Sequence, residues 1–215
     1  NRIYLHKTKL ENKSFLCAVA TDSHRLSSSS LEIDPSIDIE PIILPKKTIF
    51  QLISLIEQSN QKIKISNNKS KIKFEMNNGM LISKVIDGRF PDYSKVIPKD
   101  NDKILQIKLD EFKNSIERVT TVSSDRKEGL KIAISKDTVQ LSVNNPISGE
   151  GIENIKANFN SEDFNISFNS RYLTDIAAQI ENQSIVINLK DAGSPVLIND
   201  FSDKNSFHVV MPMKI

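Results

Sequence analysis

The chain has 215 residues, of which 38% are hydrophobic and 26% charged, and its formal net charge is +2 at pH 7. This length suffices for one large domain or two small ones. The single cysteine, Cys17, excludes a disulfide framework or a Cys-rich zinc site, and no apolar run approaches the ~20 residues of a membrane-spanning helix. With only three histidines as well, we expect a globular, cytoplasmic protein that needs no metal or other cofactor.

Charge is distributed unevenly along the chain. Residues 1–99 contain 16 Lys and Arg against 10 Asp and Glu, whereas residues 100–215 contain 13 against 17. The sign changes at Pro98–Lys103, a polar stretch of the kind that links domains. We therefore predict one domain over residues 1–99 and a second over residues 100–215. The small net charge argues against a protein that binds DNA tightly and non-specifically through a strongly basic face.

Alternating apolar and polar residues predict that β-strands dominate the chain. Short polar clusters at residues 67–68, 77–79 and 135–137 separate the strands at hairpin spacing, which favours antiparallel sheets. Strands are expected at residues 2–5, 15–22, 62–65, 71–74, 130–134, 139–143 and 185–188.

Three segments have helical spacing instead, and each is expected to form three to four turns across a sheet. The first begins at Pro45, the second near Leu109–Asp110, and the third at Asn169–Ser170, a favourable N-cap pair. The expected inward faces are Ile49, Leu52, Ile53 and Ile56 in the first helix, Phe112, Ile116 and Val119 in the second, and Leu173, Ile176, Ala177 and Ile180 in the third.

The first and third helices match at an offset of 124 residues, so that Ile49 corresponds to Leu173 and Glu57–Gln58 to Glu181–Asn182. A strand follows each helix, and we interpret the chain as a duplicated α+β unit. The second copy opens with a strand and a helix over residues 104–122 that the first copy lacks. We therefore expect such elements to precede Asn1, and the chain to be part of a longer one.

Thr21–Leu26 is the most concentrated polar cluster, and it contains Asp22, Ser23 and His24. The groups of a catalytic triad come from distant segments, whereas adjacent residues point in different directions, and no Gly-x-Ser-x-Gly elbow surrounds Ser23. Hydrolysis is therefore disfavoured here. A polar turn and a binding surface both stay open.

Two further clusters contain prolines. In Asp87–Tyr93, Asp-Gly indicates a turn and Pro91 keeps Phe90 out of the helical region, so the aromatic rings could simply anchor a loop. In Val209–Ile215, Pro212 lies between two methionines. Because proline cannot donate in a central ladder and methionine adapts to partners, this ending favours the lining of a binding surface over pure core. Cys17, within an apolar run, is expected to be core.

Ala20–Leu26, Val85–Tyr93 and Val209–Ile215, taken together in this order, make the whole chain resemble the bacterial DNA polymerase III beta subunits, the sliding clamps. The resemblance implies the DNA clamp fold, an α+β class with repeated units of antiparallel sheet and helices on one face. In that family a chain has three such units. Residues 1–99 then correspond to the second, without its first strand and helix, and residues 100–215 to the third.

The resemblance implies a processivity factor, which is a non-catalytic subunit of the DNA polymerase III holoenzyme, and no catalytic residue. Two chains of that family close into a ring around double-stranded DNA of any sequence. The ring docks the polymerase catalytic subunit, the clamp loader, repair polymerases and other proteins with short clamp-binding motifs. Because the ring contact uses the first unit, we expect these 215 residues alone to be monomeric. A stand-alone β-rich module that binds peptides or nucleic acid is the alternative.

In that family, client peptides bind a pocket between the second and third units. Apolar walls with a few polar groups suit such a ligand. Matched position by position, the resemblance implies a pocket made of Leu5, Thr21, Ser23, His24, Arg25, Leu26, Pro91, Lys95, Val96, Asn169, Tyr172, Val209, Met211, Pro212 and Met213.

In such a ring the helices would line the inner wall that faces the DNA. A sliding ring needs only modest positive charge, because each phosphate contact adds affinity that resists movement. The DNA-facing candidates are Tyr4, which matches a family aromatic residue, and the basic residues Lys46, Lys47, Lys113, Arg118 and Arg171 on the predicted helices. Solvated helix faces are the alternative for any one of these basic residues.

Several positions depart from the family pattern. Ser23 stands where glycine is common and would be strained at a positive φ. Ser94 stands where a basic residue is frequent, Lys95 and Lys214 replace arginine, Ile3 replaces an aromatic residue, and Pro195 borders the pocket. We expect these changes to alter the preference for peptides and to leave peptide binding intact.

Overall fold

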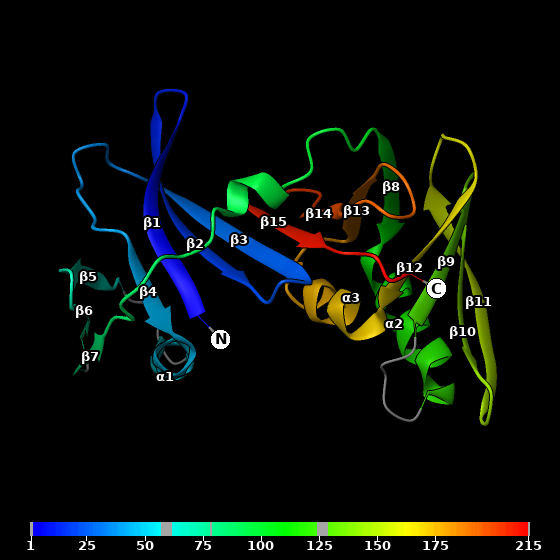
Figure 1. The fold of residues 1–215 in the computed structure, drawn as a ribbon, viewed down its shortest axis with the longest axis horizontal. Helices are drawn as coiled ribbons and strands as arrows, with labels where there is room; N and C mark the ends of the chain where they lie inside the picture. Colours follow the sequence, from blue (N-terminus) through cyan, green and yellow to red (C-terminus); the bar gives the residue numbers. More distant parts are fainter. Residues whose placement is uncertain (1, 57–61, 78, 124–128, 215) are drawn as a thin grey trace. The chain divides into compact units, whose positions relative to one another are not determined.

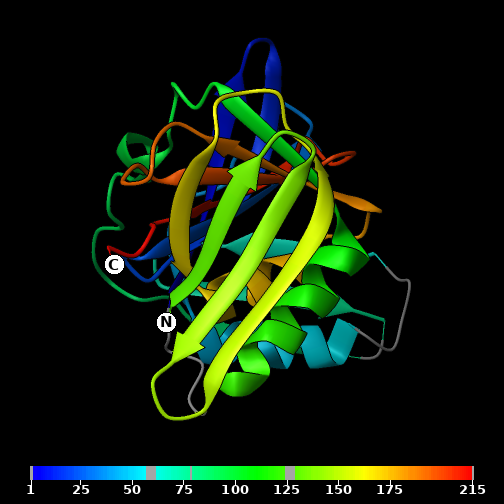
Figure 2. The same ribbon diagram turned by 90° about the vertical axis from the view of Figure 1, so that its right-hand side faces the viewer.

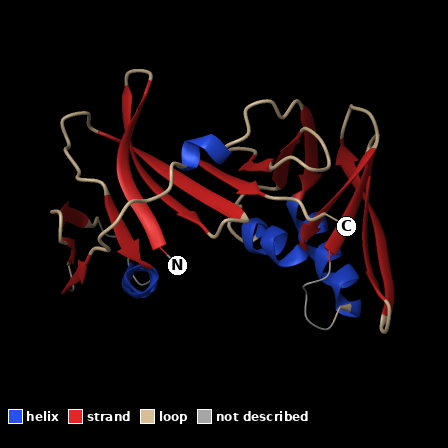
Figure 3. Cartoon of the chain, in the orientation of Figure 1, coloured by secondary structure: helices blue, strands red, loops and turns tan. Residues whose placement is uncertain are grey.

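The computed structural model describes residues 2–56, 62–77, 79–123 and 129–214. The chain divides into two compact units, unit 1 (Asn1–Asp92) and unit 2 (Tyr93–Ile215). This division falls upstream of the boundary predicted at residues 99/100. Strands dominate both units (Figure 3). None of the helices described is both long enough and apolar enough to cross a membrane.

Unit 1 consists of two antiparallel sheets and one helix among its described residues (Figure 1). The larger sheet has the order β3-β2-β1-β4 and the smaller has the order β5-β6-β7. Helix α1 directly follows β4. The bounds are β1 (Arg2–Leu10), β2 (Lys13–Thr21), β3 (Arg25–Ile33), β4 (Ile42–Pro45), α1 (Lys46–Ile56), β5 (Lys64–Asn67), β6 (Lys71–Met76) and β7 (Gly79–Lys84).

Unit 2 has strands in the order β12-β9-β10-β11-β8-β13-β14-β15. Figure 2 looks onto the antiparallel strands β9, β10 and β11, coloured green to yellow. The bounds are η1 (Tyr93–Val96), β8 (Lys103–Lys108), α2 (Leu109–Val119), η2 (Thr120–Val122), β9 (Gly129–Ser135), β10 (Thr138–Asn145), β11 (Gly149–Asn158), β12 (Phe164–Asn169), α3 (Ser170–Ala177), β13 (Ser184–Leu189), β14 (Val196–Asp200) and β15 (Ser206–Val210).

Each unit has its own hydrophobic core. In unit 1, buried Leu5 of β1 packs with Ile72 and Phe74 of β6. In unit 2, the predicted stripe of α2 is confirmed, since Phe112 and Ile116 are fully buried against the sheet residues. Burying one such side chain contributes about 1.5–3 kcal/mol. The unit 2 core therefore accounts for the position of α2 against its sheet.

The predicted repeat is confirmed. Strands β1, β2 and β3 form consecutive hairpins and β4 pairs back onto β1, just as β12 pairs back onto β9 in unit 2. At the same offset of 124, Ile72 and Phe74 of β6 correspond to Val196 and Ile198 of β14, and all four are buried. Elements β8 and α2 have no counterpart among the residues described in unit 1. Glu57–Gln58, which we matched to Glu181–Asn182, lie outside the described residues.

Two predictions about the helices were wrong in detail. Helix α3 has 8 residues, fewer than the three to four turns expected. Beyond its end, the backbone N–H groups of Glu181 and Asn182 donate to the Asp200 carboxylate and not to carbonyl groups of the preceding turn. Ile53, expected on the inward face of α1, is 44% exposed. In unit 2, α2 packs beside α3, but the described part of unit 1 offers α1 no such neighbour.

Gly151 marks a close approach between β11 and the end of α2. A Cβ atom at this position would lie 2.6 Å from the carbonyl oxygen of Val119. Glycine within a strand commonly permits such a backbone contact. It lets α2 lie directly against β11, which brings Arg118 within reach of that strand.

Candidate functional site

The β2–β3 turn of unit 1 carries most of the first predicted cluster. Thr21 ends β2 and Arg25 begins β3. The Asp22 carboxylate accepts the backbone N–H groups of His24 (3.2 Å) and Arg25 (3.0 Å) and the Arg25 Nε (3.0 Å). Ser23 has φ 73°, so the strain anticipated for a non-glycine residue is confirmed.

The same geometry identifies Asp22 as a structural carboxylate. Burial acts to raise the pKa of Asp22, but the hydrogen bonds from Arg25 and from the backbone of His24 outweigh it and hold the pKa below its ordinary value. In a triad the carboxylate would instead accept from the imidazole ring. Asp22 is therefore not placed to orient a catalytic histidine, which argues against hydrolysis at Thr21–Leu26.

The other predicted pocket residues of unit 1 differ in exposure. Leu5 and Leu26 are buried, and Leu5 is part of the unit 1 core. Ser23, His24 and Pro91 are exposed. In this unit the polar turn and the proline are thus exposed, whereas the two leucines are buried.

In unit 2 the structure brings the chain ending next to the start of α3. Strand β15 ends at Val210, and the backbone N–H of Met213 then donates to the carbonyl oxygen of Ser167 in β12 (2.7 Å). Met211 is 41% exposed and Met213 36% exposed. The tail therefore presents two methionines, and its backbone is tied to the strand that leads into α3.

The start of α3 holds two further predicted residues. Asn169 is the N-cap, and its side-chain oxygen accepts the backbone N–H of Arg171 (3.0 Å), as the predicted N-cap pair required. Half-buried Tyr172 packs against the unit 2 core. Lys95 and Val96, both exposed, lie in η1 of the same unit.

The predicted DNA-facing basic residues occupy two kinds of position. Lys46 and Lys47 form the first turn of α1, and Arg171 lies in the first turn of α3; all three are exposed. By contrast, α2 has Asp110 and Glu111 in its first turn, and its own basic residues follow later. Lys113 on α2 is half-buried.

Arg118, the last of these basic residues, is engaged within unit 2. Its Nε donates to Glu153 Oε1 of β11 (2.7 Å), and a second guanidinium nitrogen donates to Oε2 (3.1 Å). The hydrogen bond with Glu153 raises the pKa of Arg118, and the same bond lowers the pKa of the Glu153 carboxyl. A bidentate carboxylate partner makes Arg118 a weaker candidate for phosphate contact than Lys46 or Arg171.

Tyr4 is also occupied by partners of its own unit. Its ring stacks on His6 (4.5 Å between centroids) and on Phe90 (4.9 Å). Phe90 therefore anchors the Asp87–Tyr93 loop, as the sequence suggested. Tyr4 and Phe90 line a cavity of about 410 Å³ together with Arg89 and Ile86.

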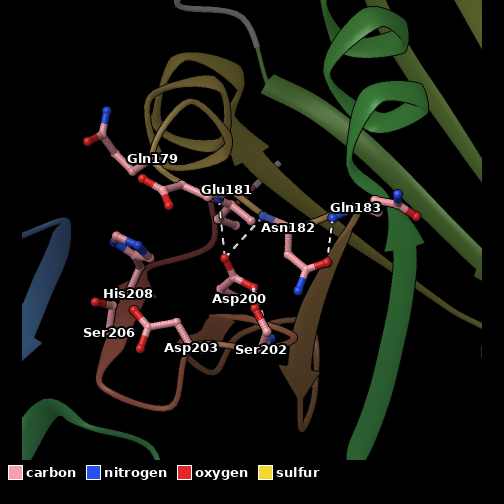
Figure 4. A pocket seen from close by; sticks show the side chains of 10 residues that line it. Gln179, Glu181, Asn182, Gln183, Asp200, Ser202, Asp203, Ser206 and His208 are labelled. Atoms are coloured by element: carbon pink, nitrogen blue, oxygen red, sulfur yellow. Dashed lines mark hydrogen bonds between the residues drawn. The ribbon is translucent and has the colours of Figure 1, made fainter.

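Sequence reasoning did not find a polar cavity of about 480 Å³ in unit 2 (Figure 4). Asp200 lies at its centre and accepts the backbone N–H groups of Glu181 and Asn182 and the backbone and hydroxyl of Ser202. Burial acts to raise the pKa of Asp200, but these hydrogen bonds hold it below its ordinary value. Asp200 thus ties the segment that follows α3 to the β14–β15 turn. A signal was available in the Asn-Asp at residues 199–200, a common turn pair.

Buried His208 also lines this cavity and gives the chain a distinct pH dependence. Burial lowers the pKa of His208 below its ordinary 6.5, so below that pH the unfolded chain takes up a proton that the folded chain resists. We expect the free energy of unfolding to fall between pH 6.5 and 5.0 by at most about 1.4 kcal/mol per pH unit. Urea unfolding at several pH values should show this loss, and His208→Gln should remove it. An identical loss in the variant would contradict the assignment.

Comparison with known proteins supplies the family. Residues 2–92 match the model for the DNA polymerase III beta subunit, central domain, and residues 94–214 match that for its C-terminal domain. The beta sliding clamp of Caulobacter vibrioides is 35% identical over all of this chain, and that of Escherichia coli K12 is 29% identical. The chain spans 58% and 59% of these two relatives.

Solved structures agree. A sliding clamp from Caulobacter crescentus is similar with a TM-score of 0.94 at 35% identity, and one from Bartonella birtlesii bound to griselimycin with 0.95 at 36% identity. Each alignment covers 100% of this chain and 58% of the solved chain. The antiparallel α+β fold expected from the sequence is thereby confirmed.

Proposed function

Because this chain belongs to the DNA polymerase III beta subunit family, we propose that it forms the central and C-terminal domains of a sliding clamp. Such a clamp is a non-catalytic processivity factor of the cytoplasm that encircles duplex DNA and docks polymerase, clamp loader and repair proteins. The observation that carries this proposal is the consecutive match of both domain models over nearly the whole chain.

The helix starts support a role beside DNA. The positive end of the helix dipole makes cations there unfavourable by about 0.3–1 kcal/mol each, yet Lys46, Lys47 and Arg171 all occupy first turns without an acidic neighbour among the described residues of those turns. Lys46 Nζ lies over the Phe50 ring (5.1 Å from its centroid), which is a stabilising contact of its own, but the helix dipole does not favour Lys47 or Arg171. Attraction of phosphates explains both their charge and their place.

A salt titration tests this role. In the full-length chain, we expect Lys46→Glu, Lys47→Glu and Arg171→Glu combined to weaken binding of a short primed duplex about tenfold, and to reduce the salt slope by up to about 0.9 for each phosphate that is no longer neutralised. Fluorescence anisotropy at 50–200 mM salt measures both. Lys9→Glu, at an exposed position near the end of β1, is the matched control. Equal slopes for the triple variant and the control would refute the DNA-facing assignment.

The two sets of predicted pocket residues support peptide docking. In unit 1 a polar turn exposes Ser23 and His24, and in unit 2 a tethered tail exposes Met211 and Met213. Polar groups that can fix a peptide backbone and adaptable apolar side chains are the combination that a short linear motif requires. A solved relative bound to griselimycin shows that a member of the family takes up a ligand.

The edge of β11 supports assembly of the full-length chain into a ring. Strand β11 pairs with β10 along residues 149–156, whereas β8 pairs with it only at Ala157 and Asn158. Most of one edge of β11 is therefore not paired by β8, and an open edge is a template for another chain. We propose that a homodimer forms through this unit and the domain that the relatives have in addition, and that these 215 residues alone are monomeric.

A further inference from the structure

The β2–β3 turn of unit 1 is organised around one carboxylate. Asp22 Oδ1 accepts the backbone N–H groups of His24 and Arg25, and Oδ2 accepts the Arg25 Nε (3.0 Å). The side chain of Asp22 thus contacts the backbone of the two residues that follow Ser23. An Asp side chain that bonds its own following backbone is a common way to fix a tight turn.

This turn needs such a constraint because its backbone is strained. Ser23 has φ 73°, a region that residues other than glycine seldom adopt. Around it, the Thr21 hydroxyl donates to the carbonyl oxygen of Arg25 (2.8 Å), and the Asp22 N–H donates to the same oxygen (3.2 Å). These bonds close the ends of the turn, whereas the Asp22 carboxylate holds its interior.

The direction of two exposed or half-exposed side chains depends on this arrangement. His24 follows the strained residue directly, so the bond from its N–H to Asp22 sets where its imidazole leaves the backbone. The guanidinium of Arg25 is held at Nε by a charge-assisted bond, which is stronger and more directional than a neutral one. Hydrogen bonding from these donors keeps the pKa of Asp22 low despite its partial burial, so the carboxylate is ionised at neutral pH.

We propose that Asp22 is a positioning residue of the peptide site, which orients His24 and Arg25 for a bound client peptide without contacting that peptide itself. This inference rests on the proposed peptide docking, and it adds to that proposal the residue that prepares the polar wall. It also explains how serine is tolerated at position 23: the Asp22 hydrogen bonds help to offset the cost of holding a non-glycine residue at a positive φ.

The test compares two substitutions in the full-length clamp. Asp22→Ala removes every carboxylate bond, and we expect a labelled pentapeptide from the polymerase to bind about tenfold more weakly. Asp22→Asn keeps an oxygen for the two backbone N–H groups, but it loses the charge and, because its NH2 group cannot accept a hydrogen bond, the bond from Arg25 Nε; a loss of about threefold is expected. Asp34→Ala is the matched control, because Asp34 caps another turn of unit 1 through the backbone N–H of Ser36. Its affinity should stay within about twofold.

A second readout separates positioning from stability. The backbone amide resonances of His24 and Arg25 should move upfield in Asp22→Ala and stay near their original shifts in Asp22→Asn, even where both variants melt at the same temperature. Wild-type affinity in Asp22→Ala, with His24→Ala weakened, would overturn the inference and leave peptide docking intact. Failure of the unmodified clamp to bind the pentapeptide would instead overturn the proposed docking and the inference with it.

Discussion

Replacing Phe112 with alanine is expected to lower the free energy of unfolding of unit 2 by about 3–5 kcal/mol. Phe112 is fully buried and lies on α2 one turn before Ile116, which is also fully buried. Removing its ring leaves a cavity in this core, and α2 cannot move closer to β11 to fill it, because the two backbones already approach closely at Gly151. Urea unfolding followed by far-UV circular dichroism measures the loss.

Phe50→Ala is the matched control for that prediction. Phe50 lies on α1 and is 59% exposed, so the same chemical change should cost less than about 1 kcal/mol. Hydrogen exchange localises the effect, since amides of α2 should lose protection in Phe112→Ala and keep it in Phe50→Ala. Similar losses from both substitutions would show that α2 does not anchor the core of unit 2.

Removing residues 211–215 from the full-length clamp is expected to weaken binding of a polymerase-derived pentapeptide at least about 100-fold, which corresponds to about 2.7 kcal/mol. The truncation deletes Met211, Pro212 and Met213, and with them the backbone bond from Met213 to Ser167. Strand β15 ends at Val210, so its ladder with β14 survives the truncation. Fluorescence anisotropy with the labelled peptide measures the affinity.

Phe201→Ala provides the control for the tail. Phe201 is 61% exposed in the same unit but lies after β14, outside the predicted pocket. Its affinity for the pentapeptide should remain within about twofold of the unmodified clamp. If the truncated clamp also retained its affinity, the tail would not belong to the peptide site.

Much of the fold was predictable because it depends on local patterns. The spacing of Phe112, Ile116 and Val119 predicts a helix with one buried face, and α2 has that face. The correspondence of Ile49 to Leu173 predicts a duplicated unit, and apart from β8, α2 and the two short 3-10 helices the two units share their element order. Periodicity and repetition are readable from the sequence because each depends only on residue spacing.

Other features were not predictable because they depend on contacts between distant segments. Asp200 accepts the N–H groups of Glu181 and Asn182 after the end of α3, and no local pattern in α3 indicates that partner. Arg118 was selected for its place on a helix, but its partner Glu153 is contributed by β11. The role of Asp22 became visible only with the φ of Ser23, which the sequence could raise as a possibility and could not determine.

Retention on DNA tests the central claim most directly. The full-length protein, labelled and loaded by a bacterial clamp loader onto a nicked circular plasmid, should stay with the plasmid through gel filtration at high salt, and should be released when a single cut makes the plasmid linear. A topological link predicts this contrast, because a closed ring leaves DNA only over a free end. Equal retention on circular and linear DNA, or equal loss from both, would contradict the assignment of this chain to a sliding clamp.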